Sequence, residues 1–224
     1  MFSEQRLDLQ NEQRIFTIAA NDYFQMVILP RVLDRLRQHA PHYSISCTPF
    51  VQDLSDTGIM SGQTDFAFGR HHDTPDNLVM RPAMSDNLAC LVSAHNTQIK
   101  QTISIELFEQ LQHIVVKPAG KLKTGIFKIL QKQSIQRHVA CTVSNFNSVP
   151  SLIAGTDYIA VLPTRICQQF AQNKQLQVYD VPPELMGHDH FPFHLSWHRR
   201  YQQDASHQWL RQQIMACCDF SIEC

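Results

Sequence analysis

The segment from Arg14 to Pro41 most constrains the fold, because it joins a strand, a polar turn and a helix without interruption (RIFTIAANDYFQMVILPRVLDRLRQHAP). Residues 15–20 form a short apolar run with β-branched side chains, which predicts a buried parallel strand. We expect Asn21 or Asp22 to cap the helix that follows. The face of that helix that covers a sheet is predicted from helical spacing as Met26, Leu29, Leu33 and Leu36.

Pro30 interrupts this helical pattern, since it has no backbone N–H to donate. We therefore expect the regular helix to begin at Pro30, after a looser first turn from Asp22. One interpretation is that free N–H groups near residues 21–23 face a ligand at the carboxyl end of the strand. The alternative, from this stretch alone, is an ordinary capped helix over a sheet.

The same order of elements repeats along the chain. Residues 43–49 and 65–69 are predicted strands, and residues 52–61 a short helix closed by Gly62. Two consecutive βαβ units predict a parallel sheet that is covered on both faces. A second α/β block is expected further on, with strands at 113–117, 138–143, 158–162 and 176–181 and helices after Ser104, at 124–133, after Asn147 or Ser148 up to Gly155, and from Pro163 to Gln172.

Two places are candidate crossings between the blocks. The first is marked by extended runs at 78–84 and 87–93, which Ser85 and Asp86 separate. The second is the aperiodic loop at 182–190, which precedes an alternating strand at 191–197. Asp204 is expected to cap a terminal helix, and its buried face is predicted as Ala205, Trp209 and Ala216.

The composition is that of a globular protein, with 43% hydrophobic and 17% charged residues. A formal net charge of −1 gives no basic footprint for nucleic acid, so we do not expect this segment to grip DNA unaided. Seven cysteines, an odd number, indicate reduced thiols, and Cys90 and Cys141 are predicted to be small buried hydrophobes. Without a signal peptide or a run of ~20 apolar residues, we expect a cytoplasmic protein with no membrane partner.

Sequence signatures of an enzyme are missing. The chain has no G-x-S-x-G, G-x-x-x-x-G-K-[ST] or G-x-G-x-x-G motif, so we assign no catalytic residue and no cofactor. The histidine-rich segments at 71–73 and 188–190 lack an evident third and fourth ligand, so we assign no metal site. Lys117, with two further lysines in the following loop, is either an anion site or a solvated loop. Phe50 and Phe146, each between a strand and a helix, either line a cleft or pack in the core.

Several segments resemble the effector-binding domain of LysR-type transcriptional regulators, over residues 14 to about 215. The opening strand and helix at 18–41 resemble the start of that domain, and GQTDFAFG at 62–69 matches its pattern G-x-x-D-x-A-x-G. Residues 143–165 (VSNFNSVPSLIAGTDYIAVLPTR) and 195–211 (LSWHRRYQQDASHQWLR) resemble the subgroup that includes nodulation-type and aromatic-degradation regulators.

The resemblance implies an α/β, type II periplasmic-binding-protein-like fold, with two Rossmann-like lobes joined by two crossover strands and a ligand in the cleft between them. It implies lobe I at residues 14–86 plus 190–218 and lobe II at 87–189, with 1–13 as the end of a linker or a disordered segment. The helix-turn-helix domain that precedes this domain in the family is absent from this chain. Effector contacts carried over from the family fall on Ala20, Asn21, Asp22, Phe50, Val51, Gly69, Arg70, Lys117, Pro118, Phe146, Asn147, Leu162 and Pro163.

The function that the resemblance implies is a non-enzymatic sensor of a small organic effector. Such a domain would dimerise through its lobes, form a higher oligomer in a full-length protein, and reach DNA only through the missing N-terminal domain. Arg70 and two helix N-termini favour a carboxylate effector, and Phe50 with Phe146 favours an aromatic one. The rival hypothesis is an enzyme on the same fold that acts on a small organic acid, with Asp22 as its acid or base. An exported solute receptor is disfavoured by the absent signal peptide and the reduced cysteines.

Overall fold

The computed structural model describes residues 7–50, 53–70, 74–117, 125–185 and 191–220. The chain divides into unit 1, Met1–Met84 with Pro192–Cys224, and unit 2, Ser85–Phe191. Both boundaries lie within strands, one in β4 (Leu78–Asp86) and the other in β10 (Phe191–His198). The sequence-based prediction divides the lobes after Asp86 and after Asp189, and residues 186–190 lie outside the described part of the chain.

Unit 1 contains a five-stranded sheet with the strand order β2-β1-β3-β10-β4. Strand β1 (Arg14–Ala20) pairs in parallel with β2 (Tyr43–Pro49) on one side and with β3 (Phe66–Gly69) on the other. The parallel pairing predicted for the strands within residues 15–69 is confirmed, and β10, which that prediction did not include, is antiparallel to β3.

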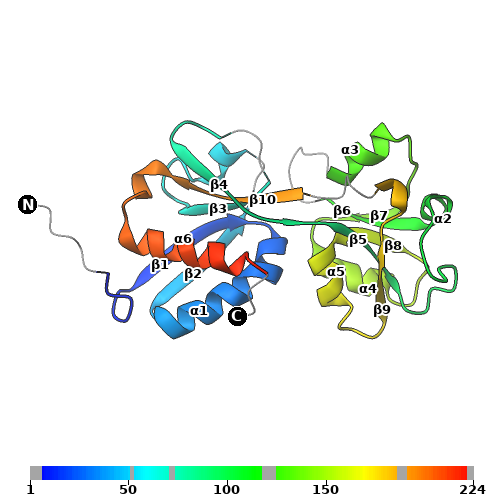
Figure 1. Ribbon diagram of the computed structural model, residues 1–224, viewed down its shortest axis with the longest axis horizontal. Helices are drawn as coiled ribbons and strands as arrows, with labels where there is room; N and C mark the ends of the chain where they lie inside the picture. The colour runs from blue at the N-terminus through cyan, green and yellow to red at the C-terminus, as the bar shows by residue number, and fades with distance from the viewer. Residues whose placement is uncertain (1–6, 51–52, 71–73, 118–124, 186–190, 221–224) are drawn as a thin grey trace, which may run out of the picture. The chain divides into compact units, whose positions relative to one another are not determined.

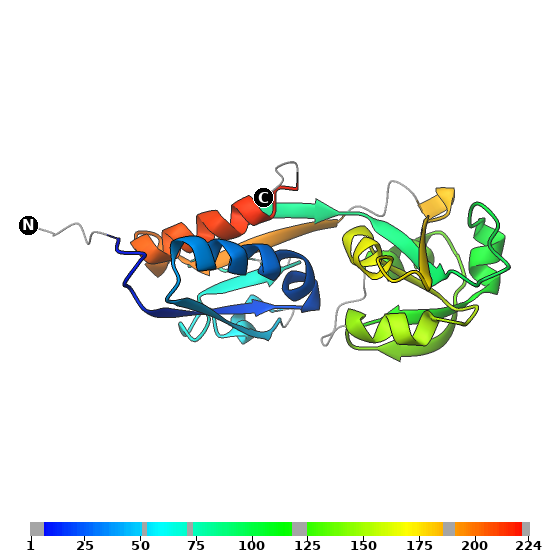
Figure 2. The ribbon, with the colours of Figure 1, turned by 90° about the horizontal axis from the view of Figure 1, so that it is seen from below.

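Different layers cover the two faces of this sheet. Helices α1 (Leu29–His39) and α6 (Ala205–Cys217) lie side by side on one face (Figures 1 and 2). On that side the rings of Phe24 and Phe68 pack with their centroids 5.0 Å apart. The opposite face carries the small side chains Ala19 and Ala67. Leu54 of a 3₁₀ turn and Ile59, which follows that turn, pack over them.

The helix after β1 begins with a π-helical turn. Asn21 caps it, because its Oδ1 accepts a hydrogen bond from the Phe24 N–H at 3.4 Å. Residues 24–28 then form the π-helix, and the Leu29 N–H donates to the Phe24 carbonyl. Pro30 stands at the start of α1, where a missing donor costs least. Of the two predicted candidates for the cap, Asn21 and Asp22, Asn21 is confirmed, and so is the predicted irregular turn before Pro30.

The predicted buried face of this helix is wrong at Leu33, whose side chain is 47% exposed. Leu36 is buried as predicted, and Met26 and Leu29 are half-buried. The other buried residues of this face are Phe24, Ile28 and Val32, so that the buried positions are four residues apart. A π-helical turn contains an extra residue, which keeps a spacing of four on one face through that turn. The prediction from spacings of three and four residues treats the whole segment as a regular α-helix. It therefore places Leu33 on the buried face in place of its neighbour Val32.

Unit 2 contains a second five-stranded sheet, with the order β7-β6-β8-β5-β9. Strand β6 pairs in parallel with β7 and β8, whereas β5 is antiparallel to both β8 and β9. This sheet too is mixed. Its strands are β5 (Leu88–Ser93), β6 (Gln112–Val116), β7 (His138–Val143), β8 (Ile159–Pro163) and β9 (Leu176–Asp180).

Four helices belong to unit 2 within the described residues. Ser104 caps the first of them as predicted, because its Oγ accepts a hydrogen bond from the Leu107 N–H at 3.3 Å. Phe108 and Cys90, both buried, lie in the hydrophobic core beneath these helices. The helices are α2 (Ile105–Gln110), α3 (Gly125–Lys132), α4 (Val149–Ile153) and α5 (Thr164–Phe170).

Strand β7 differs from its prediction as a half-buried strand. Cys141 is exposed, and Val139 is 51% exposed. The reason is that β7 lies at an edge of the sheet, with a neighbour on one side only. The prediction of a buried Cys90 is correct and that of a buried Cys141 is wrong.

Two further local predictions need correction. Residues 54–57 form a 3₁₀ turn rather than part of a longer helix, and it ends at Gly58, whose φ of +81° suits glycine. The turn before α4 is capped by Asn145, whose Oδ1 accepts from the Ser148 N–H at 3.1 Å, and not by Asn147 or Ser148. Gly155, with φ +74°, ends that helix as predicted.

The terminal helix α6 has the predicted cap and a different buried face. Asp204 Oδ1 accepts a hydrogen bond from the His207 N–H at 2.8 Å. The predicted face of Ala205, Trp209 and Ala216 is only half-buried. The residues that are buried are Ser206, His207, Leu210, Arg211, Ile214 and Cys217. Three of these buried residues are polar or charged, so a search for regularly spaced apolar residues does not find this face.

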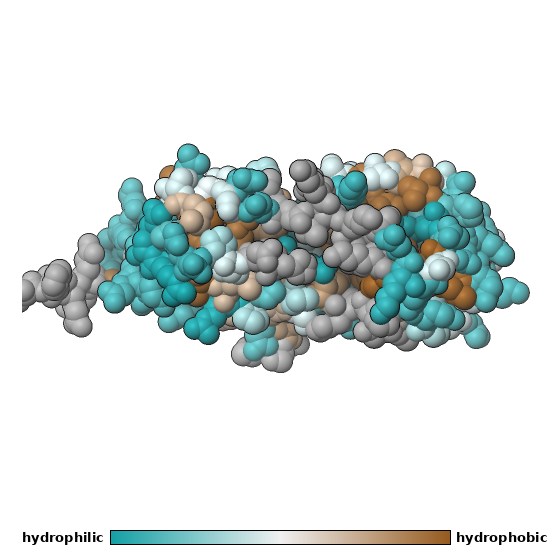
Figure 3. All heavy atoms as spheres, turned by 90° about the horizontal axis from the view of Figure 1, so that it is seen from above, coloured by the Kyte–Doolittle hydropathy of each residue, from teal (hydrophilic) through white to brown (hydrophobic). Residues whose placement is uncertain are grey.

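Hydrophilic side chains cover most of the described surface on the face seen in Figure 3, and hydrophobic ones appear there as separate small groups. The helices among the described residues are too short or too polar to cross a membrane. The described residues also contain no group of three or more side chains suited to hold a metal ion. The histidine-rich segments at 71–73 and 188–190 lie outside that part of the chain.

Adjacent residues of α1 give a matched test of its buried face. Val32→Ala is expected to lower the free energy of unfolding by about 2 kcal/mol, because Val32 is fully buried and the change leaves a cavity. Leu33→Ala is expected to change it by less than about 0.5 kcal/mol. Urea unfolding of both variants measures the difference, and a larger loss for Leu33→Ala would contradict the assigned face.

Candidate functional site

The candidate site lies where three neighbouring parallel strands of unit 1 end. Ala20, the last residue of β1, lies opposite Pro49 of β2 and Phe68 of β3. The residues that follow these strands therefore gather at one edge of the sheet, the place where open α/β sheets bind ligands. We call this the carboxyl-edge site, and it comprises Asn21, Asp22, Phe50, Gly69 and Arg70.

The helix that begins at Asp22 contributes the positive end of its dipole to this edge. Its cap Asn21 and its first residue Asp22 are both half-buried. A carboxylate in the first turn is itself stabilised by the dipole, so Asp22 offsets part of the positive potential that an anionic ligand would meet. The backbone N–H groups of this turn are nonetheless suited to accept a negatively charged group.

Phe50 and Gly69 form a notch that only glycine permits. A Cβ atom added to Gly69 would lie 2.6 Å from Cζ of Phe50 and within 2.9 Å of two more ring atoms. The tip of the Phe50 ring therefore rests on the backbone of Gly69. Since Phe50 is half-buried, it presents part of its aromatic surface at the same edge.

The motif at 62–69 now has a physical explanation at each of its fixed positions. Gly62 has a φ of +85°, which favours glycine. Asp65 ties β3 to β1, because its Oδ2 accepts from the Thr17 N–H at 2.8 Å and its own N–H donates to the Thr17 carbonyl at 2.9 Å. Ala67 is fully buried beneath the 3₁₀ turn, and Gly69 receives the Phe50 ring.

Arg70 is the cationic group of the carboxyl-edge site. It follows β3 directly and is half-buried. Burial lowers the pKa of its guanidinium, which still remains protonated near neutral pH. A guanidinium at a strand end can bind a carboxylate through two parallel hydrogen bonds.

The structure adds residues to this edge that sequence reasoning does not single out. His194 of β10 lies opposite Gly69, and Thr48 of β2 lies opposite Ala19. The Thr48 hydroxyl oxygen is buried and has no hydrogen-bond partner among the described residues. Buried polar groups are rarely left in this state, so this oxygen is a candidate contact for a ligand or a water molecule. Only the pairing of distant strands brings these residues to the site.

An aromatic layer lies beside the edge on the helix-covered face. The rings of Tyr23 and Phe193 stack with centroids 4.3 Å apart, and those of Phe193 and Phe68 stack at 5.5 Å. All three side chains are almost completely buried. This layer fixes the start of the helix against β3 and β10, and so holds Asn21 and Asp22 in place.

The corresponding edge of unit 2 carries the second group of sequence-predicted residues. The Lys117 N–H donates to the Val143 carbonyl at 2.8 Å, which brings the ends of β6 and β7 together. Lys117 itself is exposed. Leu162 and Pro163, at the end of β8, are buried, so they offer backbone rather than side-chain contacts. Val51 and Pro118 lie outside the described residues.

Phe146 and Asn147 lie in a 3₁₀ turn after β7. Phe146 is 8% exposed, whereas Asn147 is exposed. The helix α4 that follows has five residues, too few for a substantial dipole. This helix start is therefore a weak source of positive potential, and the predicted ligand contacts at Phe146 and Asn147 stay predictions.

A buried ion pair fixes the junction of β4 and β5 within unit 2. Arg165 Nη1 lies 3.1 Å from Asp86 Oδ1, and the Asp86 side chain is 3% exposed. The Arg165 backbone N–H also donates to Asp86 Oδ2 at 3.3 Å, and its guanidinium donates to the Ser85 carbonyl at 3.0 Å. These bonds hold the first turn of α5, and with it Pro163, against the strand junction.

Comparison with known proteins identifies the family. Residues 9–218 match the model of the LysR substrate binding domain, so the chain belongs to that family. It is 30% identical over 202 residues to the HTH-type transcriptional regulator SyrM of Rhizobium meliloti, covering 89% of this chain and 60% of that protein. It is 28% identical over 208 residues to Nodulation protein D 2 of Sinorhizobium fredii, covering 92% and 65%. The chain thus spans about three fifths of the length of the curated relatives it matches.

Solved structures share the fold. The regulatory domain of MexT, a transcriptional activator of Pseudomonas aeruginosa, superposes with a TM-score of 0.79 at 24% identity, over 90% of this chain and 98% of that one. Full-length CbnR in complex with its target DNA matches with a TM-score of 0.71 at 11% identity, over 92% and 71%. The predicted fold class, two α/β lobes of the type II periplasmic-binding-protein-like kind, is confirmed.

The notch at Gly69 can be tested with a double-mutant cycle. Gly69→Ala is expected to cost about 1 to 3 kcal/mol of unfolding free energy, because the added methyl displaces the Phe50 ring. In a Phe50→Ala background the same substitution is expected to cost less than about 0.5 kcal/mol. Urea unfolding gives all four values, and strictly additive costs would show that the two residues do not touch.

Proposed function

We propose that this chain is the effector-sensing part of a LysR-type transcriptional regulator, and that it binds a small organic molecule at the carboxyl-edge site of unit 1. The observation that carries the proposal is the meeting of three parallel strand ends, a helix N-terminus, a half-buried arginine and an aromatic notch at one edge. Ala20 would contribute its backbone. The predicted contacts of unit 2, at Lys117, Phe146, Asn147, Leu162 and Pro163, stay predictions.

The names of the relatives support the regulatory part of this proposal. SyrM is a helix-turn-helix-type transcriptional regulator, and CbnR has been solved with its target DNA. With a formal net charge of −1, the chain has no excess of basic residues with which to grip DNA itself. DNA contact would therefore be made by a separate helix-turn-helix domain. The chain described here would serve as the sensor and as a dimerisation module.

The chemistry of the site favours an effector with a carboxylate and an aromatic ring. The Arg70 guanidinium and the helix start at Asp22 supply donors and positive potential for a carboxylate. The exposed part of the Phe50 ring offers a surface on which a second ring can stack. Since Asp22 is itself acidic, a single negative charge suits the site better than two.

The mechanism that fits such a sensor is a population shift. A ligand changes the balance between two conformations only if it binds one of them more tightly. The proposed contacts come from three separate segments, namely those that follow β1, β2 and β3. All of these contacts can be formed in one conformation and only some of them in another. Occupancy would then be passed on as a change in the population of the conformation that the rest of the regulator recognises.

A panel of aromatic carboxylates tests this proposal by isothermal titration calorimetry. For the panel member that binds most tightly, Arg70→Gln is expected to weaken binding by about tenfold or more, because a charge-assisted hydrogen bond is lost. Arg81→Gln is the matched control, since Arg81 is an exposed arginine of β4 away from the strand ends. Binding that is equally tight for neutral aliphatic compounds and insensitive to Arg70→Gln would contradict the proposed chemistry.

The rival enzymatic hypothesis predicts a different result in the same experiment. A catalytic Asp22 would convert the bound compound, and Asp22→Asn would abolish that turnover while leaving binding in place. The sensor hypothesis predicts that the compound is recovered unchanged after incubation with the wild-type chain. Detection of a product by mass spectrometry, lost in Asp22→Asn, would overturn it.

A further inference from the structure

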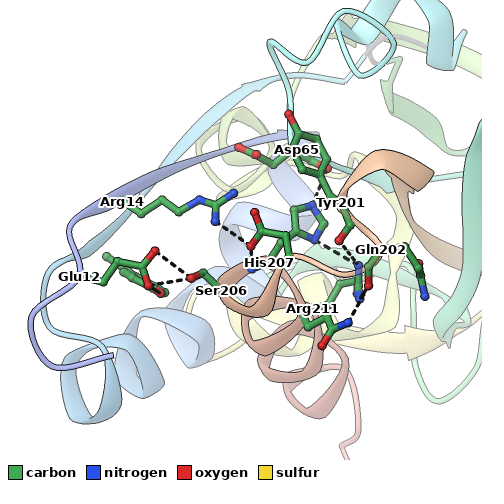
Figure 4. Close-up of polar contacts among 11 residues, drawn as sticks. Glu12, Arg14, Asp65, Tyr201, Gln202, Ser206, His207 and Arg211 are labelled. Carbon is green, nitrogen blue, oxygen red and sulfur yellow. Dashed lines mark hydrogen bonds and ion pairs between the residues drawn. The ribbon is translucent and has the colours of Figure 1, made fainter. Parts of the chain in front are cut away.

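The amino end of the unit 1 sheet, opposite the carboxyl-edge site along the same strands, holds a network of polar contacts (Figure 4). Glu12 accepts hydrogen bonds from Tyr43 Oη at 2.6 Å and from Ser206 Oγ at 2.7 Å. Arg14 Nη1 donates to Asp204 Oδ1 at 2.8 Å. The segment that leads into β1 is therefore fastened to the first turn of α6 by two charged side chains.

His207 lies behind that turn and is fully buried. Its backbone N–H donates to Asp204 Oδ1 at 2.8 Å, the same oxygen that Arg14 binds. Its ring packs between Phe66, with centroids 4.0 Å apart, and Tyr201, at 4.9 Å and nearly parallel. Any displacement of the ring would therefore also displace the first turn of α6, to which Glu12 and Arg14 are bonded.

The hydrogen bonds of the ring determine its protonation state. Nε2 lies 3.3 Å from the Asp65 carbonyl oxygen, which can only accept, so Nε2 carries the hydrogen. Nδ1 lies 3.3 Å from Arg211 Nη1, which can only donate, so Nδ1 must be the acceptor. Arg211 is held in this position by its stacking over the Trp197 ring at 4.5 Å and by the Tyr201 carbonyl at 3.4 Å. The contacts accordingly select the neutral imidazole.

We propose that His207 is a proton-operated catch for residues 7–13, the segment that leads into β1: neutral His207 holds the first turn of α6 in place together with Glu12 and Arg14, and protonated His207 releases them.

A second proton on His207 would have to bind Nδ1. It would remove the acceptor for Arg211 and place an imidazolium 3.3 Å from a guanidinium in a buried position. The ring would then have to move away from Arg211, and Asp204 and Ser206 belong to the same turn. The loss of their bonds to Arg14 and Glu12 is the expected consequence.

The groups that face His207 come from α6, from the residue before it, from β1 and from the residue before β3. Arg211 of α6 and Arg14 of β1 oppose its protonation, whereas Asp204 favours it, and Asp65 presents its carbonyl. Burial, opposed by the hydrogen bond to that carbonyl, lowers the pKa of His207 to about 4. Burial also raises the pKa of the Asp65 carboxyl, which weakens the negative charge that could compensate an imidazolium.

The direction of the pH effect follows from these values. Above pH ~6.5 the His207 imidazole is neutral both when the segment is bound to α6 and when it is released. Protonation therefore does not favour release in this range. As the pH falls from ~6.5 towards 4, the released form takes up a proton that the held form excludes, and release becomes progressively more favourable.

Hydrogen exchange measured by mass spectrometry on the whole chain tests the proposal. Peptides that cover residues 7–17 are followed from pH 7 to pH 4, with rates corrected for the intrinsic effect of pH on exchange. The wild type is expected to lose protection in these peptides with an acidic midpoint. His207→Gln keeps one donor and one acceptor but cannot be protonated in this range, so its midpoint is expected to fall by about one pH unit or more.

Two further variants make the test decisive. Arg211→Gln removes the cation and keeps a donor, so protonation of His207 meets less repulsion and the midpoint is expected to shift. His113→Gln is the control, because His113 is a buried histidine of unit 2 whose pKa burial also lowers to about 4. It should leave the midpoint of residues 7–17 unchanged. An unaltered midpoint in His207→Gln, or an equal shift in His113→Gln, would overturn the proposal.

Discussion

The parallel pairing of β1 with a strand on each side is the interaction on which the rest of unit 1 depends. Its register places Ala20 opposite both Pro49 and Phe68, so three loops leave the sheet together at one edge. Asp65 reinforces that register, because its backbone and its carboxylate both bind Thr17. A slip of one residue would turn the buried side chains of β1 to the wrong face and separate Asn21 from Gly69.

The two ends of the same strands serve different purposes in this account. At the carboxyl ends the Phe50 ring rests on the backbone of Gly69, Arg70 is half-buried, and the Thr48 hydroxyl has no hydrogen-bond partner among the described residues. At the amino ends every named group is bonded to a neighbouring element, as Glu12 is to Tyr43 and Ser206. A domain that senses a ligand needs both, since the site must adapt while its attachment to the chain stays firm.

Local signals in the sequence predict local structure well. The caps at Asn21, Ser104 and Asp204 are recognisable because a short polar side chain stands directly before an apolar periodic segment. The strand ends that make up the candidate site follow from the same reasoning, since each is a short apolar run that stops at a polar residue or at glycine.

What the sequence could not predict depends on long-range pairing or on irregular backbone. No propensity marks the π-helical turn before Pro30, and the face of α1 that the sheet covers carries Val32 rather than Leu33. Cys141 is exposed because β7 has one neighbour, a fact about the order of strands rather than about residues 138–143. His194 and Thr48 reach the site only through β10 and β2, and the contact of Phe50 with Gly69 joins loops on two different strands.

The central claim is that a small organic effector binds at the carboxyl ends of β1, β2 and β3, and mapping of amide chemical shifts by NMR tests it most directly. Titration of the ¹⁵N-labelled chain with an aromatic carboxylate such as benzoate or salicylate is predicted to shift the amides of Asn21, Asp22, Phe50 and Arg70 in a saturable manner. Amides at the amino ends of the same strands, such as those of Arg14 and Tyr43, should stay in place. Saturable shifts confined to those amino-end residues, with none at Asn21 or Arg70, would contradict the account.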